Sequence, residues 1–174
     1  MKRFFMILLK PLSFLPAIAI LYVIFTFSGH SGVDSGALSH KVSRTVVTVG
    51  AKLLDKDLSD EQVEHYIERI HLPVRKAAHM AQYFFLAVAV SFPLYVYRLR
   101  GFWLLLVAGA ICLAVAGLDE YRQSFVTGRV GSKQDVMIDG VGIFFGIMVV
   151  RIVCWTALAP SRLKARRAKR RNTK

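Results

Sequence analysis

The chain has 174 residues, of which 55% are hydrophobic and 20% are charged, and its formal net charge is +13. One soluble domain could have this length, but the apolar residues are clumped in long runs rather than spaced periodically, which indicates a membrane protein. The two cysteines, Cys112 and Cys154, both lie inside apolar runs. The sequence therefore offers no disulfide framework and no cysteine-based metal spacing, and it also lacks the phosphate-loop, G-x-S-x-G and HExxH motifs.

Four stretches are long enough to cross a membrane, which takes roughly 17–25 mostly apolar residues in a helix. They lie at about Leu12–Phe27, Ala77–Tyr97, Phe102–Leu118 and Val136–Ala159. The first is short unless Phe4–Leu9 joins it past Lys10, whose long side chain can reach the interface. We expect this span to be retained rather than cleaved as a signal peptide, because its apolar run is too long and no A-x-A site follows. The predicted fold class is an all-α membrane protein with a four-helix transmembrane bundle.

The distribution of charge predicts the orientation of these spans. Thirteen basic residues and no acidic residue occupy three segments: the chain up to Lys10, the link with Arg98 and Arg100, and the tail from Arg162 to Lys174. By the positive-inside rule both termini are cytoplasmic, and the loops 28–76 and 119–135 face outward. Residues 1–160 then form the membrane domain and 161–174 a basic cytoplasmic tail. Beside a span, such a tail contacts anionic lipid headgroups of the bilayer, so no nucleic-acid partner is expected.

Two amphipathic helices are predicted in the first outward loop. The first, between Ser39 and Leu54, carries apolar residues at helical spacing, at Val42, Val46, Val49 and Leu53. The second begins at a capping box formed by Ser59 and Gln62 and ends near Pro73. We expect both helices to lie on the outer interface or to cover the bundle. The alternative is that they are two solvated surface helices without a function of their own.

Polar residues precede the second span. Arg75 and His79 are four residues apart, as are His79 and Tyr83, while Lys76 and Gln82 lie close by. Residues at this spacing share a helix face, so the end of this helix is polar and basic on one side. Because the span begins outside, His79 lies about one turn below the outer surface.

Acidic residues lie at the same predicted depth on two other spans. Asp119 and Glu120 close the third span, with Gln123 one turn after Asp119, and Asp135 and Asp139 open the fourth. An unpaired aspartate at membrane depth costs roughly 2.5–3.5 kcal/mol. We therefore expect these carboxylates to meet the basic face of the second span in one patch.

Small residues predict close helix packing. The fourth span carries Gly140, Gly142 and Gly146, and the third carries Ala108, Ala110, Ala114 and Ala116. Such residues allow the backbones of two membrane helices to approach each other. Arg151, in the inner half of the fourth span, is expected to reach the interface or a backbone carbonyl.

Three segments together resemble one known family. Arg75–Tyr83 reads R-K-x-x-H-x-x-x-Y, Asp119–Arg129 reads D-E-x-x-Q-x-F-x-x-G-R, and Asp135–Gly142 reads D-x-x-x-D-x-x-G. With Phe27-Ser28 at the end of the first span, they resemble the VanZ-like family of bacterial membrane proteins over about Leu12–Val150. The resemblance implies a small multi-pass protein of the bacterial cytoplasmic (inner) membrane. The name-giving member of the family is associated with resistance to the glycopeptide teicoplanin.

The resemblance also marks individual positions. The shared polar and glycine positions of the family fall on Arg75, Lys76, His79, Tyr83, Asp119, Glu120, Gln123, Gly128, Arg129, Asp135, Asp139 and Gly142. The position of Asp139 is often asparagine in the family, so the acid here changes the charge balance or the metal affinity of the site. The family has no established biochemical mechanism to transfer to this chain.

One interpretation is an enzyme that acts on a lipid-linked or cell-wall substrate. His79 would be the general acid or base, because histidine titrates nearest neutral pH. The other catalytic candidates, which would orient it or hold a divalent cation, are Asp119, Glu120 and Asp135. The candidates for substrate binding are Arg75, Lys76, Gln123, Arg129 and Asp139, of which the arginines suit a phosphate or carboxylate. No nucleophile is specified, and the metal and any cofactor stay unknown.

Two other interpretations remain open. The same residues suit non-catalytic binding of an anionic envelope amphiphile or a glycopeptide. They also suit an ion-pair network that only holds helix ends together in an interaction protein, since buried charge networks can be structural. A metal site has ligands available but no diagnostic spacing.

Overall fold

The computed structural model describes the backbone of residues 11–129 and 131–171, and the side chains in these ranges up to Thr156. The expectations for Lys2, Arg3, Lys10 and Phe4–Leu9, and for the side chains of the basic tail, fall outside the described residues. The elements in chain order are η1 (Pro11–Phe14), α2 (Leu15–Ser28), α3 (Gly32–Leu53), α4 (Asp60–Val96), α5 (Gly101–Gln123) and α6 (Lys133–Arg171).

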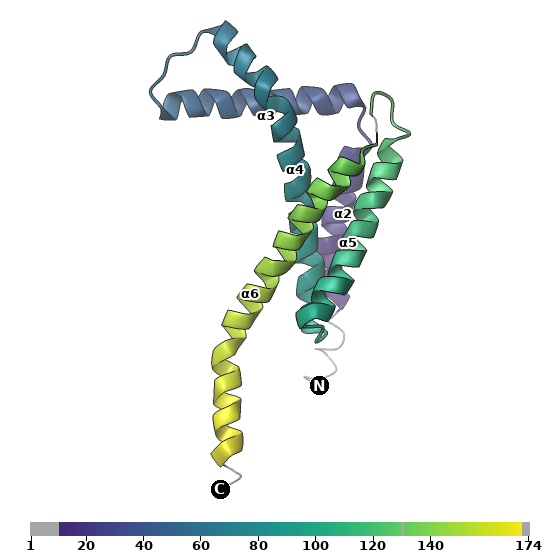
Figure 1. Cartoon of the computed structure of the whole chain (residues 1–174), viewed down its shortest axis with the longest axis vertical. Coiled ribbons are helices and arrows are strands. Elements are labelled where there is room, and N and C mark those ends of the chain that lie inside the picture. The colour runs from purple at the N-terminus through teal and green to yellow at the C-terminus, as the bar shows by residue number, and fades with distance from the viewer. Residues whose placement is uncertain (1–10, 130, 172–174) are drawn as a thin grey trace.

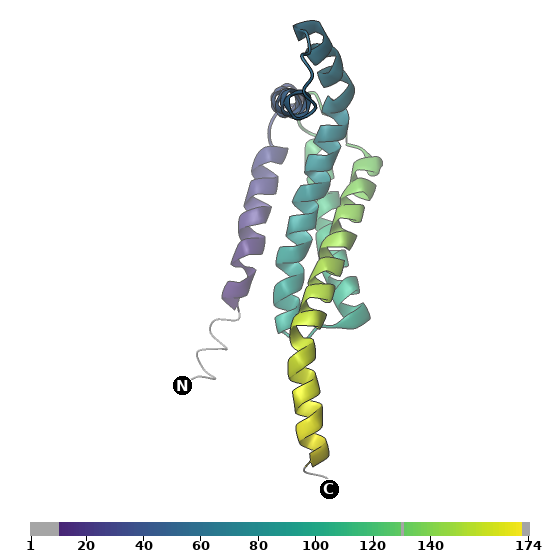
Figure 2. The ribbon, with the colours of Figure 1, turned by 90° about the vertical axis from the view of Figure 1, so that its left-hand side faces the viewer.

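Four of these helices form the predicted bundle. The segments long and apolar enough to cross a membrane are Pro11–Ser28, Asp60–Val96, Gly101–Gln123 and Lys133–Thr156. Figures 1 and 2 show α2, α4, α5 and α6 running side by side, while α3 crosses the bundle near one end. We call this the α3 end, where α2 and α5 finish and α6 begins, and the opposite one the tail end. The predicted all-α membrane fold is thereby confirmed.

The predicted helix end near Pro73 is wrong, because α4 continues without a break from Asp60 to Val96. A proline inside a helix removes one backbone hydrogen bond and crowds the preceding turn. Membrane helices tolerate this where neighbouring elements satisfy the freed groups. The predicted start is confirmed: Ser59 Oγ accepts from the Gln62 amide at 3.4 Å, and Gln62 Oε1 accepts from the Ser59 amide at 3.1 Å.

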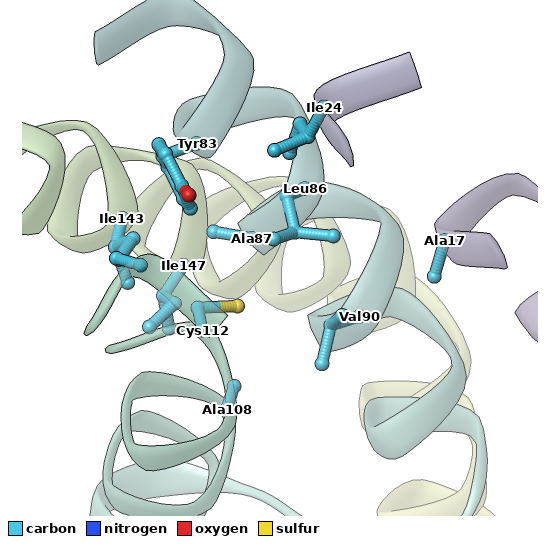
Figure 3. Close-up of a cluster of buried hydrophobic side chains, with 11 residues drawn as sticks. Ala17, Ile24, Tyr83, Leu86, Ala87, Val90, Ala108, Cys112, Ile143 and Ile147 are labelled. Atoms are coloured by element: carbon cyan, nitrogen blue, oxygen red, sulfur yellow. The ribbon is translucent and has the colours of Figure 1, made fainter. Parts of the chain in front are cut away.

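The core lies where α4 meets α5 and α6, with α2 against its side (Figure 3). Its buried side chains include Tyr83, Leu86, Ala87, Ala108, Cys112, Ile143 and Ile147. Lipid tails are as apolar as these side chains, so such helices associate through close packing. Gly142 and Gly146 allow α6 to pack closely against α4, because a Cβ atom at either position would overlap a backbone carbonyl of α4. The predicted small-residue contact is thus an α4–α6 contact.

The amphipathic helix α3 packs its polar side on α4. His40 Nε2 and Arg44 Nη2 contact the Glu64 carboxylate at 2.7 and 3.2 Å. The predicted apolar stripe stays exposed: Val46 is 51% and Leu53 is 82% exposed. An exposed apolar stripe on a helix that crosses the end of a bundle is typical of a membrane interface. A place for α3 at the interface stays a prediction.

Candidate functional site

The middle of α4, the end of α5 and the start of α6 meet at the α3 end of the bundle. A cavity of about 180 Å³ lies between α4, α6 and the segment that links α5 to α6. Its polar lining residues are Arg75, Lys76, His79, Gln123, Arg129, Asp135 and Asp139. We call it the α4–α6 cavity. It contains seven of the nine predicted site residues, although they come from segments up to 64 positions apart in the sequence.

A second cavity, of about 190 Å³, lies on the other side of the same basic residues. Arg75, His79 and Arg129 line both cavities, and Asp119 lines this one. Residues of α2 and α3 complete its wall, so we call it the α2–α3 cavity. The imidazole of His79 thus borders two spaces, each of which also contains a carboxylate.

We call the nine predicted site residues the cluster. Two of its carboxylates, those of Asp119 and Asp139, are almost completely buried. Asp119 is 2% exposed, and its Oδ2 accepts a hydrogen bond of 2.9 Å from Gln123 Nε2. The fully buried Tyr83 lies close to the same carboxylate. Asp139 is also 2% exposed, and its Oδ1 has no hydrogen-bond partner among the described residues. A buried carboxylate oxygen without a partner is costly, so the cavity beside Asp139 suits a ligand that donates hydrogen bonds.

The basic side of the cluster is also incompletely paired. Arg129 has two buried guanidinium nitrogens, Nε and Nη1, without a hydrogen-bond partner among the described residues. Burial and the nearby Arg75 guanidinium lower the pKa of Arg129 from its usual value. Two guanidinium groups that face the same cavities repel each other. An anion bound between the two guanidinium groups would offset their repulsion and accept several charge-assisted hydrogen bonds.

The described side chains do not form a closed ion-pair network at this site. The ion pairs with nitrogen-to-oxygen distances within 4.0 Å in residues 11–129 and 131–156 are His40–Glu64 and Arg44–Glu64. Both join α3 to α4, and neither belongs to the cluster. In the same residues, no group of three His, Cys, Asp or Glu side chains is arranged to hold a metal ion.

Glu120, a predicted catalytic residue, lies beside the cavities rather than in their walls. Its Oε1 accepts a hydrogen bond of 2.6 Å from the Ser132 amide. Ser132 belongs to the segment between α5 and α6, just before Asp135. Glu120 therefore holds the start of α6 against the end of α5, which positions Asp135 and Asp139.

Sequence reasoning missed the contact that positions Arg129. Gly128, at φ +76°, lies against Gly32 at the start of α3, and the Gly32 amide donates to the Thr127 carbonyl at 3.1 Å. A Cβ atom at position 32 would overlap the Gly128 carbonyl. The sequence around Gly32 predicts only a turn, and nothing in it identifies a partner 96 positions away.

We expect Gly32→Ala to destabilise the folded protein by about 1–3 kcal/mol, because the added methyl group forces the α5–α6 segment away from α3. Gly36→Ala is the matched control, since nothing lies within 4 Å of a Cβ atom built there. Thermal unfolding of the two purified variants in the same detergent measures the difference. Equal melting temperatures would show that the contact between Gly32 and Gly128 contributes nothing to stability.

Serines form a second group that the sequence analysis did not select. Ser28 at the end of α2, with Ser35 and Ser39 on α3, lines the α2–α3 cavity. Ser28 is 4% exposed, and its Oγ has no hydrogen-bond partner among the described residues. The resemblance at Phe27-Ser28 was the available signal, but it gave Ser28 no role.

The comparisons agree with the motifs on which the resemblance rests. No curated protein and no solved structure matches the chain. The VanZ/LLP1 family model matches residues 13–154, which include α2 to α5, most of the spanning part of α6 and every candidate site residue. The chain therefore belongs to the VanZ/LLP1 family.

Proposed function

We propose that this protein binds the anionic head group of an amphiphilic cell-envelope molecule at the extracytoplasmic face of the bacterial inner membrane. The observation that supports this most is the α4–α6 cavity, whose lining includes Arg75, Arg129 and Asp139. The arginines suit a phosphate or carboxylate, and Asp139 suits a hydroxyl or amine of the same head group. A phosphorylated, lipid-linked sugar has both kinds of group.

The orientation is part of the proposal. The positive-inside rule assigns the tail end, with Arg98, Arg100 and the tail from residue 161, to the cytoplasm. The α3 end and both cavities then face outward, where envelope precursors and glycopeptides are present. In this orientation the basic tail contacts anionic headgroups of the inner leaflet.

A catalytic function is the second candidate, favoured by the position of His79. Its imidazole lies between the two cavities, close enough to Asp119, Asp135, Arg75 and Arg129 for electrostatic interaction. Such an imidazole can move a proton to or from a bound head group, while an arginine holds its anion. In this candidate Asp119 and Asp135 orient His79, and Glu120 keeps the α5–α6 segment in place.

Purified protein incubated with radiolabelled envelope lipids separates these two functions. Saturable binding without product formation assigns the protein to recognition. Product formation by the wild type that is lost in His79→Ala and Asp119→Asn, while their melting temperatures are kept, assigns it to catalysis. If the wild type shows neither binding nor turnover, the proposal is contradicted.

Resistance to teicoplanin, implied by the name-giving member of the family, would act through the same site. A host made more resistant by expression of the wild type should become susceptible again with His79→Ala or Asp119→Asn at equal membrane abundance. Resistance that persists in both variants would separate the phenotype from the cluster.

A further inference from the structure

A third cavity, of about 350 Å³, lies at the tail end between the end of α4, the start of α5 and α6. Two guanidinium groups, those of Arg100 and Arg151, line it together with Tyr95 and Trp155. Arg151 follows Asp139 by twelve residues on α6, which corresponds to roughly 18 Å along the helix. This basic cavity is therefore separate from the candidate site at the α3 end.

No side-chain carboxylate of the chain is placed to neutralise these two arginines. All eleven acidic residues lie between Asp34 and Glu68 or between Asp119 and Asp139, toward the α3 end. Asp119 is nineteen residues from Arg100 along α5, roughly 28 Å at the rise of an α-helix. The positive charges at the tail end must therefore be compensated by something outside the protein chain.

The two guanidinium groups are nevertheless held in place. Arg100 lies over the Tyr95 ring at 5.1 Å from its centroid, a cation–π distance. The Arg151 side chain is half-buried, and its described hydrogen bond is to Met148 Sδ at 3.9 Å, a weak acceptor. These contacts position the cations beside the cavity but leave their charge unbalanced.

The depth of Arg151 points to the anion that balances it. Trp155, one turn further along α6, is 65% exposed, and tryptophan concentrates at the boundary between headgroups and acyl chains. Arg151 then lies roughly 6 Å inside that boundary, where its guanidinium group is more favourable when an anion pairs with it. The phosphate of a phospholipid in the same leaflet is the anion within its reach.

We infer that the Arg100–Arg151 cavity binds the phosphate of an anionic phospholipid. The two guanidinium groups donate hydrogen bonds to the phosphate oxygens, and the acyl chains run along the exposed apolar surface of α6. Basic pockets between spanning helices bind anionic lipids in this way. This site lies between the end of α4, the start of α5 and α6, and it differs from the contact proposed for the tail beyond residue 160.

The test is a lipid titration of the purified full-length protein in a neutral detergent. The melting temperature of the protein is measured at each lipid concentration. Phosphatidylglycerol is expected to raise the melting temperature of the wild type, and phosphatidylcholine is not. Arg100→Gln and Arg151→Gln should each increase the half-saturating concentration of phosphatidylglycerol about tenfold. The matched control is Arg98→Gln, because Arg98 is exposed in the same link but does not line the cavity.

Each outcome decides the inference. If Arg98→Gln weakens the lipid response as much as Arg100→Gln, the effect is general surface charge and the site is refuted. If inorganic phosphate stabilises the wild type as strongly as phosphatidylglycerol, the assignment to a lipid is wrong. Should Arg151→Gln fail to fold, the exposed Arg100 still decides between these results. Envelope-lipid binding at the α3 end is unaffected by these substitutions, so a failure here leaves the proposed function standing.

Discussion

Replacing Arg129 with glutamine is expected to weaken binding of the envelope amphiphile about 100-fold, and Arg75→Gln/Arg129→Gln is expected to abolish it. A factor of 100 in affinity corresponds to about 2.7 kcal/mol of binding free energy. This value lies within the range of about 1.5–3 kcal/mol for hydrogen bonds to charged groups. The measurement is equilibrium binding of radiophosphorus-labelled envelope lipids to purified protein. Arg69→Gln is the matched control, because Arg69 is exposed on α4 and lines none of the described cavities.

The same substitution should not destabilise the ligand-free protein. Burial and the nearby Arg75 lower the pKa of Arg129 in the folded protein relative to the unfolded chain. A cationic group whose pKa falls on folding is less stable charged in the folded state, so its charge opposes folding at neutral pH. Arg129→Gln removes that cost, and the melting temperature should stay equal or rise. A large fall in the melting temperature with unchanged binding would instead identify Arg129 as a structural element of an ion-pair network.

Gly142→Ala is expected to lower the free energy of unfolding by about 3 kcal/mol, near the upper end of the range for overpacking. The added methyl group would overlap the Met80 carbonyl of α4, a backbone atom that cannot rotate away. Met80 directly follows His79 on α4, and Gly142 lies about one turn after Asp139 on α6. Separating α4 from α6 should therefore also open the α4–α6 cavity and weaken amphiphile binding.

Gly140→Ala provides the control for this effect. A Cβ atom at Gly140 meets the Leu113 side chain at 3.7 Å, an ordinary contact. Both substitutions replace glycine with alanine in the same turn of α6, so they share the gain in helix propensity. Equal unfolding free energies of the two variants in a detergent titration would show that the backbone approach at Gly142 does not hold α4 and α6 together.

The lengths of the apolar runs and the helical periodicity of the sequence predicted most of the fold. Apolar runs of membrane length identified four spans because the bilayer sets one length for every spanning helix. The positions of His79 and Asp139 near the ends of two spans predicted that they share a depth. Both residues line the α4–α6 cavity, and their shared depth in the membrane stays a prediction. Periodicity also identified α3, with its apolar stripe at the predicted positions.

Other features depend on contacts that one sequence does not reveal. Pro73 predicts a helix end locally, but the packing of α4 along its length decides whether the helix continues. Glu120 has the same chemistry as Asp119 and lies beside it in the sequence. Only the path of the α5–α6 segment shows that Glu120 accepts a backbone hydrogen bond while Asp119 faces a cavity.

The proposed function requires that residues of α4 and α6 line one cavity that opens outward and attracts anions. It is tested most directly by thiol labelling of His79→Cys and Asp135→Cys in intact cells, since both native cysteines are buried. We expect both introduced cysteines to react with membrane-impermeant reagents added from outside. His79→Cys should react faster with a negatively charged reagent than with a positively charged one. Reaction of the two positions from opposite sides of the membrane, or only after the cells are permeabilised, would contradict it.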